Sequence, residues 1–166
     1  NRVSPEAPVP IVEQKYIDDR LGGAANVALN AASLGADVAL LGIVGKDGNA
    51  QIIRDLLVKS KIKTFLVDSE TKPTINKIRL STPSHQLMRV DIEECFSCPD
   101  SQEVKRKFSN LIDDYDVVIF SDYAKGTLND VGTLLKLCSD KSKITIVDPK
   151  GNDFKKYSGA TFVTPN

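Results

Sequence analysis

The sequence predicts an α/β fold in which a mostly parallel β-sheet is covered by helices on both faces. Short apolar runs typical of buried strands alternate with stretches of helical periodicity along most of the chain. Strands that alternate with helices in this way are typical of parallel sheets. The chain is 41% hydrophobic and 27% charged over 166 residues, which suits one globular domain or most of one.

The first expected element of this fold is a helix over residues 22–34. The segment is rich in Ala, Val and Leu and has no strongly polar face, a pattern typical of a buried helix. Gly35 follows it as a C-terminal cap. The remaining elements are expected in this order: strand 38–44, helix 49–59, strand 62–67, a helix opened by a capping box at 100–103, strand 117–120, helix 128–138, strand 144–147 and strand 161–163.

Residues 73–92 depart from this alternation. Two extended runs, 73–80 and 86–92, flank the turn-rich sequence Ser-Thr-Pro-Ser, which predicts an antiparallel hairpin. The N-terminal segment is rich in proline, which forbids a helix and suits an extended edge strand. We expect this strand, at about residues 8–17, to join the hairpin in a small second sheet.

Polar and charged residues follow the predicted core strands, at the carboxyl ends where open parallel sheets bind ligands. Loops are commonly polar because they are exposed to water, so any one of these loops alone is explained without a binding site. Asp and Lys together after three of the four strands favour a site at this edge. The residues concerned after the later strands are Asp122 and Lys125, Asp148 and Lys150, and Asn166.

Gly22 and Gly23 open the first helix, and Asn26 lies in its first turn. Backbone N–H groups at a helix start are unpaired, so they suit an anion or sugar hydroxyls. A tight turn that lets the helix pack closely explains the same glycines equally well. The glycine spacing fits neither the dinucleotide fingerprint nor the Walker phosphate loop.

The expected hairpin places cations on one of its faces. Side chains alternate between the faces of a strand, so Lys77 and Arg79 share one face, as do Arg89 and Asp91 on the second strand. The planar fork of arginine suits phosphate oxygens. A solvated outer face is the alternative interpretation.

Composition argues against several other functions. Lys plus Arg and Asp plus Glu each number 22, so nothing favours nucleic-acid or anionic-membrane binding. Apolar runs stay shorter than the roughly 18 residues of a membrane span, and we expect a cytoplasmic protein. Cys95 and Cys98 have metal-like spacing without further ligands to complete a zinc site. The only histidine, His85, lies in the expected turn, which disfavours a Ser-His-Asp site.

Residues 20–28, Arg-Leu-Gly-Gly-Ala-Ala-Asn-Val-Ala, resemble the N-terminal signature of the PfkB carbohydrate kinases, the ribokinase-like family. Six segments in order are similar, within this family, to the heptose-7-phosphate kinases of lipopolysaccharide core synthesis. Together they run along essentially the whole chain. They are residues 2–10, 22–26, 86–91, 121–126, 148–151 and 164–166.

This resemblance implies ATP-dependent phosphorylation of D-glycero-β-D-manno-heptose 7-phosphate at its anomeric hydroxyl, giving the 1,7-bisphosphate, with ATP and Mg²⁺ as cofactors. It implies a ribokinase-like α/β core with a small β-sheet lid at about residues 8–17 and 73–92, and a homodimer formed through that lid. The residues it implies on the substrate side are Gly22, Gly23, Asn26, Lys77, Arg79, Arg89, Asp91, Asp122 and Lys125. Those it implies toward the nucleotide phosphates are Asp148, Lys150 and Asn166.

Several parts of the family pattern do not occur in the sequence, among them the Glu of the family's Asn-x-x-Glu element and the opening strand with its substrate-binding Asp. The Gly-Ala-Gly-Asp element, which in this family carries the catalytic Asp, does not occur in the sequence. We therefore expect residues 1–166 to be the N-terminal part of one kinase domain, incomplete at both ends, with the catalytic Asp beyond residue 166 and no turnover from this segment alone. Two alternatives stay open: another PfkB sugar or nucleoside kinase, and a non-catalytic module that binds sugar phosphates or dimerises.

Overall fold

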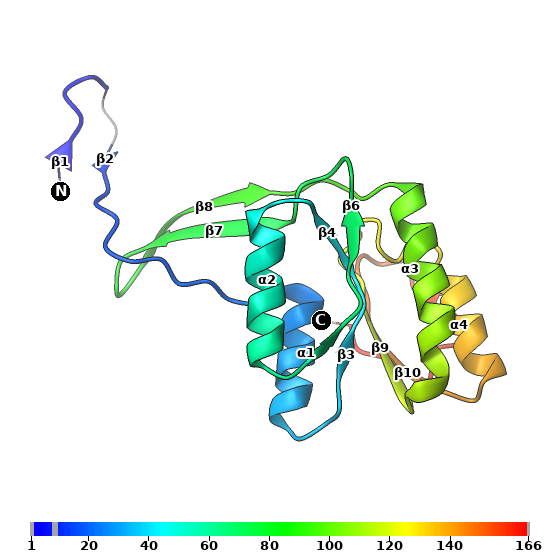
Figure 1. Ribbon diagram of the computed structural model, residues 1–166. Coiled ribbons are helices and arrows are strands. Elements are labelled where there is room, and N and C mark those ends of the chain that lie inside the picture. Colours follow the sequence, from blue (N-terminus) through cyan, green and yellow to red (C-terminus); the bar gives the residue numbers. More distant parts are fainter. Residues whose placement is uncertain (1, 8–9, 166) are drawn as a thin grey trace.

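The computed structural model describes residues 2–7 and 10–165 as a layered α/β core from which a long hairpin projects (Figure 1). The α-helices are α1 (Gly23–Ser33), α2 (Gly48–Lys59), α3 (Cys98–Leu111) and α4 (Val131–Asp140). The core strands are β3 (Ala39–Leu40), β4 (Ile43–Gly45), β5 (Lys63–Thr64), β6 (Val67–Ser69), β9 (Val117–Ser121), β10 (Ile144–Asp148) and β11 (Phe162–Val163). Short 3₁₀ turns lie at Ile112–Asp114 and Lys155–Tyr157.

All the core strand pairs are parallel within the described residues, which confirms the predicted class. β10 lies between β9 and β11, β3 pairs with β5, and β4 pairs with β6. The expected strands 38–44 and 62–67 are each interrupted. Pairing nevertheless continues across the interruption, because the Phe65 N–H donates to Leu40 O and the Val67 N–H to Gly42 O, both at 2.9 Å.

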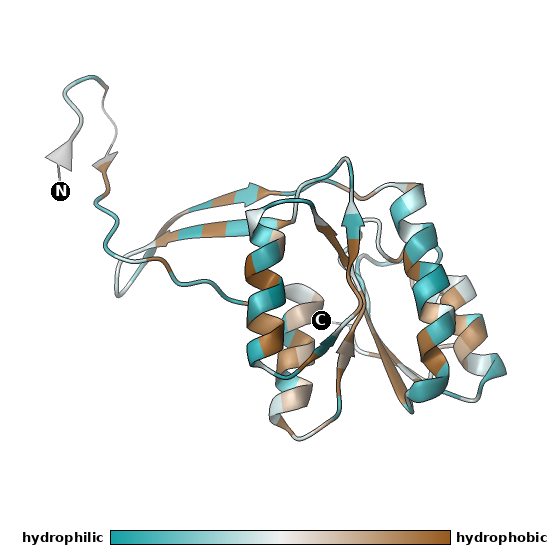
Figure 2. Ribbon diagram, in the orientation of Figure 1, coloured by the Kyte–Doolittle hydropathy of each residue, from teal (hydrophilic) through white to brown (hydrophobic). Residues whose placement is uncertain are grey.

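Two apolar clusters hold the helices against these strands, one on each side of the molecule (Figures 1 and 2). On one side α1 and α2 pack against β3 and β4 around Leu57, which is fully buried. On the other, α3 and α4 cover β9 and β10 around Leu135, Cys138 and Val147. Burying a side chain of this size contributes about 1.5–3 kcal/mol, so these clusters stabilise the packing of the helices on the strands.

The first helix is less buried than its composition suggests. α1 has nearly the expected bounds, but Ala28 is its one fully buried residue and the next residue, Leu34, is 89% exposed. Only one face of α1 packs against β3 and α2, so small residues on the other faces stay half-buried or exposed. The expectation of a helix buried on nearly all sides is wrong.

The helix predicted to open with a capping box at 100–103 begins earlier. Ser97 is its N-cap, and the Ser97 N–H and hydroxyl donate to Asp100 Oδ2 at 3.1 and 2.6 Å. Pro99 falls in the first turn, where no N–H is needed. Asp100 thus closes the box that it was expected to open. The last helix begins at Val131 rather than 128, after a turn in which Val131 N–H donates to Leu128 O.

The expected hairpin is present as β7 (Asn76–Ser81) and β8 (Gln86–Ile92), paired antiparallel. The proline-rich segment does not join it in the described residues. β2 (Pro10–Ile11) pairs instead with β1 (Arg2–Val3), and residues 12–22 have no regular secondary structure. Pro10 lacks an N–H to donate, which limits the pairing that this strand can offer; residues 8 and 9 lie outside the described part.

Candidate functional site

The helix-opening turn has the backbone geometry that its glycines predict. Gly22 caps α1 in an extended conformation, whereas Gly23 has φ +51°, a left-handed conformation that favours glycine. The Ala25 and Asn26 N–H groups both donate to Gly22 O. Asn26 is exposed and lines a cavity of about 240 Å³ with Arg20, on the side facing α2.

Tyr123, which the sequence did not single out, lies against this turn. A Cβ added to Gly23 would come within 3.5 Å of the Tyr123 ring, and the ring itself is 45% exposed. The turn and the loop that follows β9, residues 122–126, therefore lie side by side at Gly23 and Tyr123. The tyrosine lies inside one of the segments that carry the family resemblance, but no pattern in its own neighbourhood indicated the contact.

Asp122 begins the same loop and is 6% exposed. Its carboxylate accepts hydrogen bonds from Tyr157 Oη at 2.6 Å, Lys156 Nζ at 2.8 Å and the Ala124 N–H at 2.7 Å. Burial would raise the pKa of Asp122, but the hydrogen bonds from Lys156 and Tyr157 prevail and lower it. In this arrangement Asp122 orders the loop, and a ligand would meet a carboxylate already bound to three donors.

Lys125, at the other end of the loop, reaches the base of the hairpin. Its Nζ lies 2.7 Å from Glu93 Oε1, and Lys77 Nζ lies 2.9 Å from Glu93 Oε2. Lys77 also pairs with Asp91 at 3.0 Å, and Arg89 Nε with the same carboxylate at 2.9 Å. The side-chain hydrogen bonds from Lys125 and Lys77 lower the pKa of Glu93 to about 2.

One face of the hairpin therefore carries the predicted cations, but it carries carboxylates as well. Lys77 lies opposite Asp91 and Arg79 opposite Arg89 in the register of β7 and β8. Four cations and two carboxylates form what we call the hairpin charge cluster. Its members are Lys77, Arg79, Arg89, Asp91, Glu93 and Lys125.

The hairpin is attached to the core at both of its legs. At the first leg, Asp47 accepts from the Thr74 N–H and hydroxyl, both at 2.7 Å, and the Gly45 N–H donates to Thr74 Oγ1 at 2.9 Å. At the second leg, the Phe96 N–H donates to Lys125 O at 2.9 Å. A Cβ at Gly45 would lie 2.6 Å from Thr74 N, and one at Gly126 would lie 2.5 Å from Phe96 O. Glycine at both positions permits this close approach.

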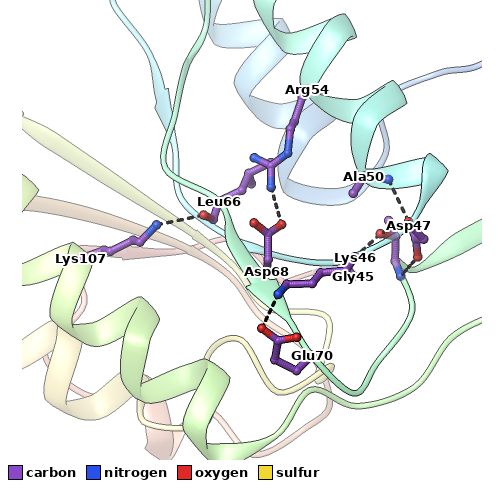
Figure 3. A network of polar contacts seen from close by, with 10 residues as sticks. Gly45, Lys46, Asp47, Ala50, Arg54, Leu66, Asp68, Glu70 and Lys107 are labelled. Atoms are coloured by element: carbon purple, nitrogen blue, oxygen red, sulfur yellow. Dashed lines mark hydrogen bonds and ion pairs between the residues drawn. The ribbon is translucent and has the colours of Figure 1, made fainter.

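The turn between β4 and α2 is itself held in place by polar contacts (Figure 3). Asp47 caps α2 by accepting from the Ala50 N–H at 2.9 Å. Arg54 on α2 pairs with Asp68 on β6, and Lys107 on α3 donates to Leu66 O at 2.9 Å. The first leg of the hairpin is therefore attached to a part of the core whose helices and strands are joined by several polar contacts.

Asp148 and Lys150, two of the residues expected toward the nucleotide, lie at the same edge of the sheet as Asp122. Asp148 ends β10 opposite Ser121, and its carbonyl accepts from the Asp122 N–H at 2.9 Å. The Lys150 N–H donates to Tyr157 Oη at 3.1 Å. Thr164 follows β11 and its N–H donates to Val147 O. Asn166 lies outside the described residues.

Residues 2–7 and 10–165 contain no group of three or more His, Cys, Asp or Glu side chains placed to hold a metal ion. Over the same part of the chain, none of the helices has both the length and the apolar character needed to cross a bilayer.

The sheet order and the meeting of loops at its carboxyl edge define a ribokinase-like α/β fold, as comparisons with solved structures show. Escherichia coli phosphofructokinase-2, in its tetrameric inhibited form, superposes with a TM-score of 0.66 at 14% identity, covering 92% of this chain and 55% of that one. A chain provisionally assigned as ribokinase II from Escherichia coli, in complex with ATP and Mg²⁺, gives 0.63 at 14% identity, covering 87% and 49%.

Comparisons at the level of sequence assign the chain to a family within this fold. The family model for pfkB family carbohydrate kinases matches residues 1–166, and the chain belongs to that family. It is 44% identical over 166 residues to the bifunctional protein HldE of Haemophilus influenzae. That alignment covers all of this chain and 35% of the relative, so the chain spans about a third of the relative's length.

Proposed function

We propose that the protein containing this chain transfers a phosphoryl group from Mg-ATP to the anomeric hydroxyl of D-glycero-D-manno-heptose 7-phosphate. The observation that carries the proposal is the hairpin charge cluster, which meets the loop after β9 through Lys125. Two residues earlier, Tyr123 lies beside the turn at Gly23. A sugar held against that turn would thus have cations within reach for a phosphate that it already carries.

Each part of this site has a defined task in the proposal. The Gly23 and Ala24 N–H groups at the start of α1 and the side chain of Asn26 face sugar hydroxyls, because the Ala25 and Asn26 N–H groups already donate to Gly22 O. The cations of the cluster bind the 7-phosphate, where arginine and lysine form strong charge-assisted bonds. Asp122 holds the loop between them through Lys156 and Tyr157.

The cofactor is proposed to approach from the neighbouring strand ends. Asp148 and Lys150 offer a carboxylate and an ammonium group there, which are group types that suit Mg²⁺ and phosphate oxygens respectively. Mg-ATP supplies the phosphoryl group, and phosphoryl transfer depends mainly on positioning and charge stabilisation. Because ATP is the donor, we place the reaction in the cytoplasm. Residues 1–166 alone should show no turnover, since the Gly-Ala-Gly-Asp element is absent from them.

The hairpin also offers a surface for a second copy of the chain. Its face opposite the charge cluster exposes Ile78, Met88, Val90 and Ile92, each between 41% and 54%. Pairing two such faces would bury apolar area that water now covers. We therefore propose a homodimer through this lid, to be measured by sedimentation of the complete protein.

Turnover of the complete protein on a panel of sugars tests the proposed reaction. ADP release is followed with heptose 7-phosphate, ribose and fructose phosphates as acceptors. We expect kcat/KM for heptose 7-phosphate to exceed the others by at least about a hundredfold, because a site whose polar groups are matched to one substrate discriminates strongly. Comparable or faster turnover of ribose or a fructose phosphate would identify another PfkB kinase, and binding without turnover a non-catalytic module.

A further inference from the structure

Glu93 occupies a bridging position that neither the sequence nor the family resemblance assigns. It follows β8 directly, and its two carboxylate oxygens each accept from a different lysine. Lys77 comes from β7 and Lys125 from the loop after β9, so the bridge joins the hairpin to the core. Glu93 and Lys125 side chains are 28% and 30% exposed, which leaves the bridge reachable from solvent.

The bridge leaves hydrogen-bonding capacity free for an anion. An ammonium group has three donors. Lys77 uses two of them, on Asp91 and Glu93, and Lys125 uses one on Glu93. An arriving phosphate can therefore bind both lysines without displacing Glu93.

The same carboxylate keeps the two lysines close together. Two ammonium groups repel each other at short range, and a carboxylate between them offsets that repulsion. Its pKa of about 2 keeps Glu93 ionised throughout the physiological pH range. With four cations and two carboxylates in the cluster, the net charge stays positive while Glu93 is present.

We propose that Glu93 is a positioning residue that holds Lys77 and Lys125 as a pair for the phosphate of the sugar substrate, an inference that rests on the proposed function. Glu93 does not touch the substrate in this account. It acts through the two lysines, so its loss weakens substrate binding more than the chemical step.

The neighbouring glutamate provides a matched control. Glu94 pairs with Lys72 at 2.5 Å, at the base of the hairpin and outside the charge cluster. Glu93→Gln and Glu94→Gln remove the same charge from adjacent positions. A general effect of charge or of hairpin stability would therefore appear in both variants.

The experiment measures KM and kcat for heptose 7-phosphate in the complete protein. We expect Glu93→Gln to raise KM by about tenfold, the scale of a charged hydrogen bond, with kcat within about twofold of wild type. Glu94→Gln should leave both near wild type. In a Lys125→Met background, Glu93→Gln should add much less than it does alone, because residues that act through one another are not additive.

The outcomes separate this inference from the proposed function. Turnover by the wild type reports on the function alone, and the ratio of variant to wild type reports on Glu93. An unchanged or lowered KM in Glu93→Gln, an equal rise in Glu94→Gln, or full additivity with Lys125→Met would overturn the inference. Should Glu93→Gln fail to fold, Glu93→Asp replaces it: its shorter carboxylate should give an intermediate KM, and a wild-type KM would count against the bridge.

Discussion

At the scale of the residue, the two glycines that open α1 have different roles. Gly23 has φ +51°, whereas Gly22 has an extended backbone that any residue can adopt. We expect Gly23→Ala to lower the free energy of unfolding of the complete protein by about 1–2 kcal/mol, the cost of a left-handed conformation for an L-residue. Urea titration measures the change.

Gly22→Ala is the matched control for that substitution. A Cβ at Gly22 meets nothing within 4 Å, and a Cβ at Gly23 meets the Tyr123 ring only at ordinary contact distance. Gly22→Ala should therefore change stability by less than about 0.5 kcal/mol. Equal losses in the two variants would show that the left-handed conformation of Gly23 is not what requires glycine in this turn.

Asp122 yields a prediction about pH. Its folded-state pKa lies below the ordinary value, so the stability it contributes is present above the unfolded-state pKa and is lost as pH falls through the folded pKa. Asp122→Asn should cost about 2 kcal/mol or more near pH 7, since it breaks a buried charged network. The difference from wild type should shrink toward pH 3. A pH-independent difference in urea titrations would contradict this.

At the scale of the element, the hairpin depends on how its legs are attached. Thr74→Val removes the hydroxyl that donates to Asp47 and accepts from the Gly45 N–H. We expect a loss of about 1–3 kcal/mol, because buried partners are left unsatisfied, and faster hydrogen exchange over residues 72–96. Thr71→Val, at an exposed neighbouring position, should leave both unchanged. Equal exchange in the two variants would show that this leg does not anchor the hairpin.

Local sequence patterns predicted an element correctly where a single feature, such as a turn or an apolar run, specifies it. The hairpin follows from its turn and alternation, and β9 and β10 from short apolar runs. The start of α3 was misplaced because Asp100 fits a capping box either as its first or as its last member. The N-terminal strand was expected beside the hairpin, although a single sequence carries no information on which edge a short strand will choose.

The candidate site depends even more on contacts between distant parts of the chain, which local sequence patterns do not reveal. Sequence alternation placed Lys77 and Arg79 on one face, but the contacts of Glu93 with Lys125 and of Tyr123 with the turn at Gly23 join residues about thirty or more positions apart along the chain. Such contacts depend on how the legs of the hairpin dock, which no local pattern records. Asp122 was expected to face a ligand; burial and its three donors, two of them from Lys156 and Tyr157, show a structural task as well.

At the scale of the whole molecule, an α/β core carries the hairpin formed by β7 and β8. The charged face of this hairpin is joined to the carboxyl edge of the sheet through Lys125 and Glu93. Two apolar clusters stabilise the core, and hydrogen bonds at Thr74 and at Phe96 attach the hairpin to it. The turn at Gly22 and Gly23, the loop after β9 and the hairpin thus converge from three parts of the chain. This convergence, and not any single motif, supports a site for a sugar that carries a phosphate.

A phosphate-binding site at the hairpin is tested by the affinity of the complete protein for heptose 7-phosphate, compared with its affinity for the same heptose lacking the phosphate. Calorimetric titration of both sugars, in wild type and in Arg89→Ala, measures it. We predict that the phosphate strengthens binding by about a hundredfold or more in the wild type, as several charge-assisted bonds would, and that Arg89→Ala removes much of that gain. Equal affinity for the two sugars, or an unchanged gain in Arg89→Ala, would contradict the account.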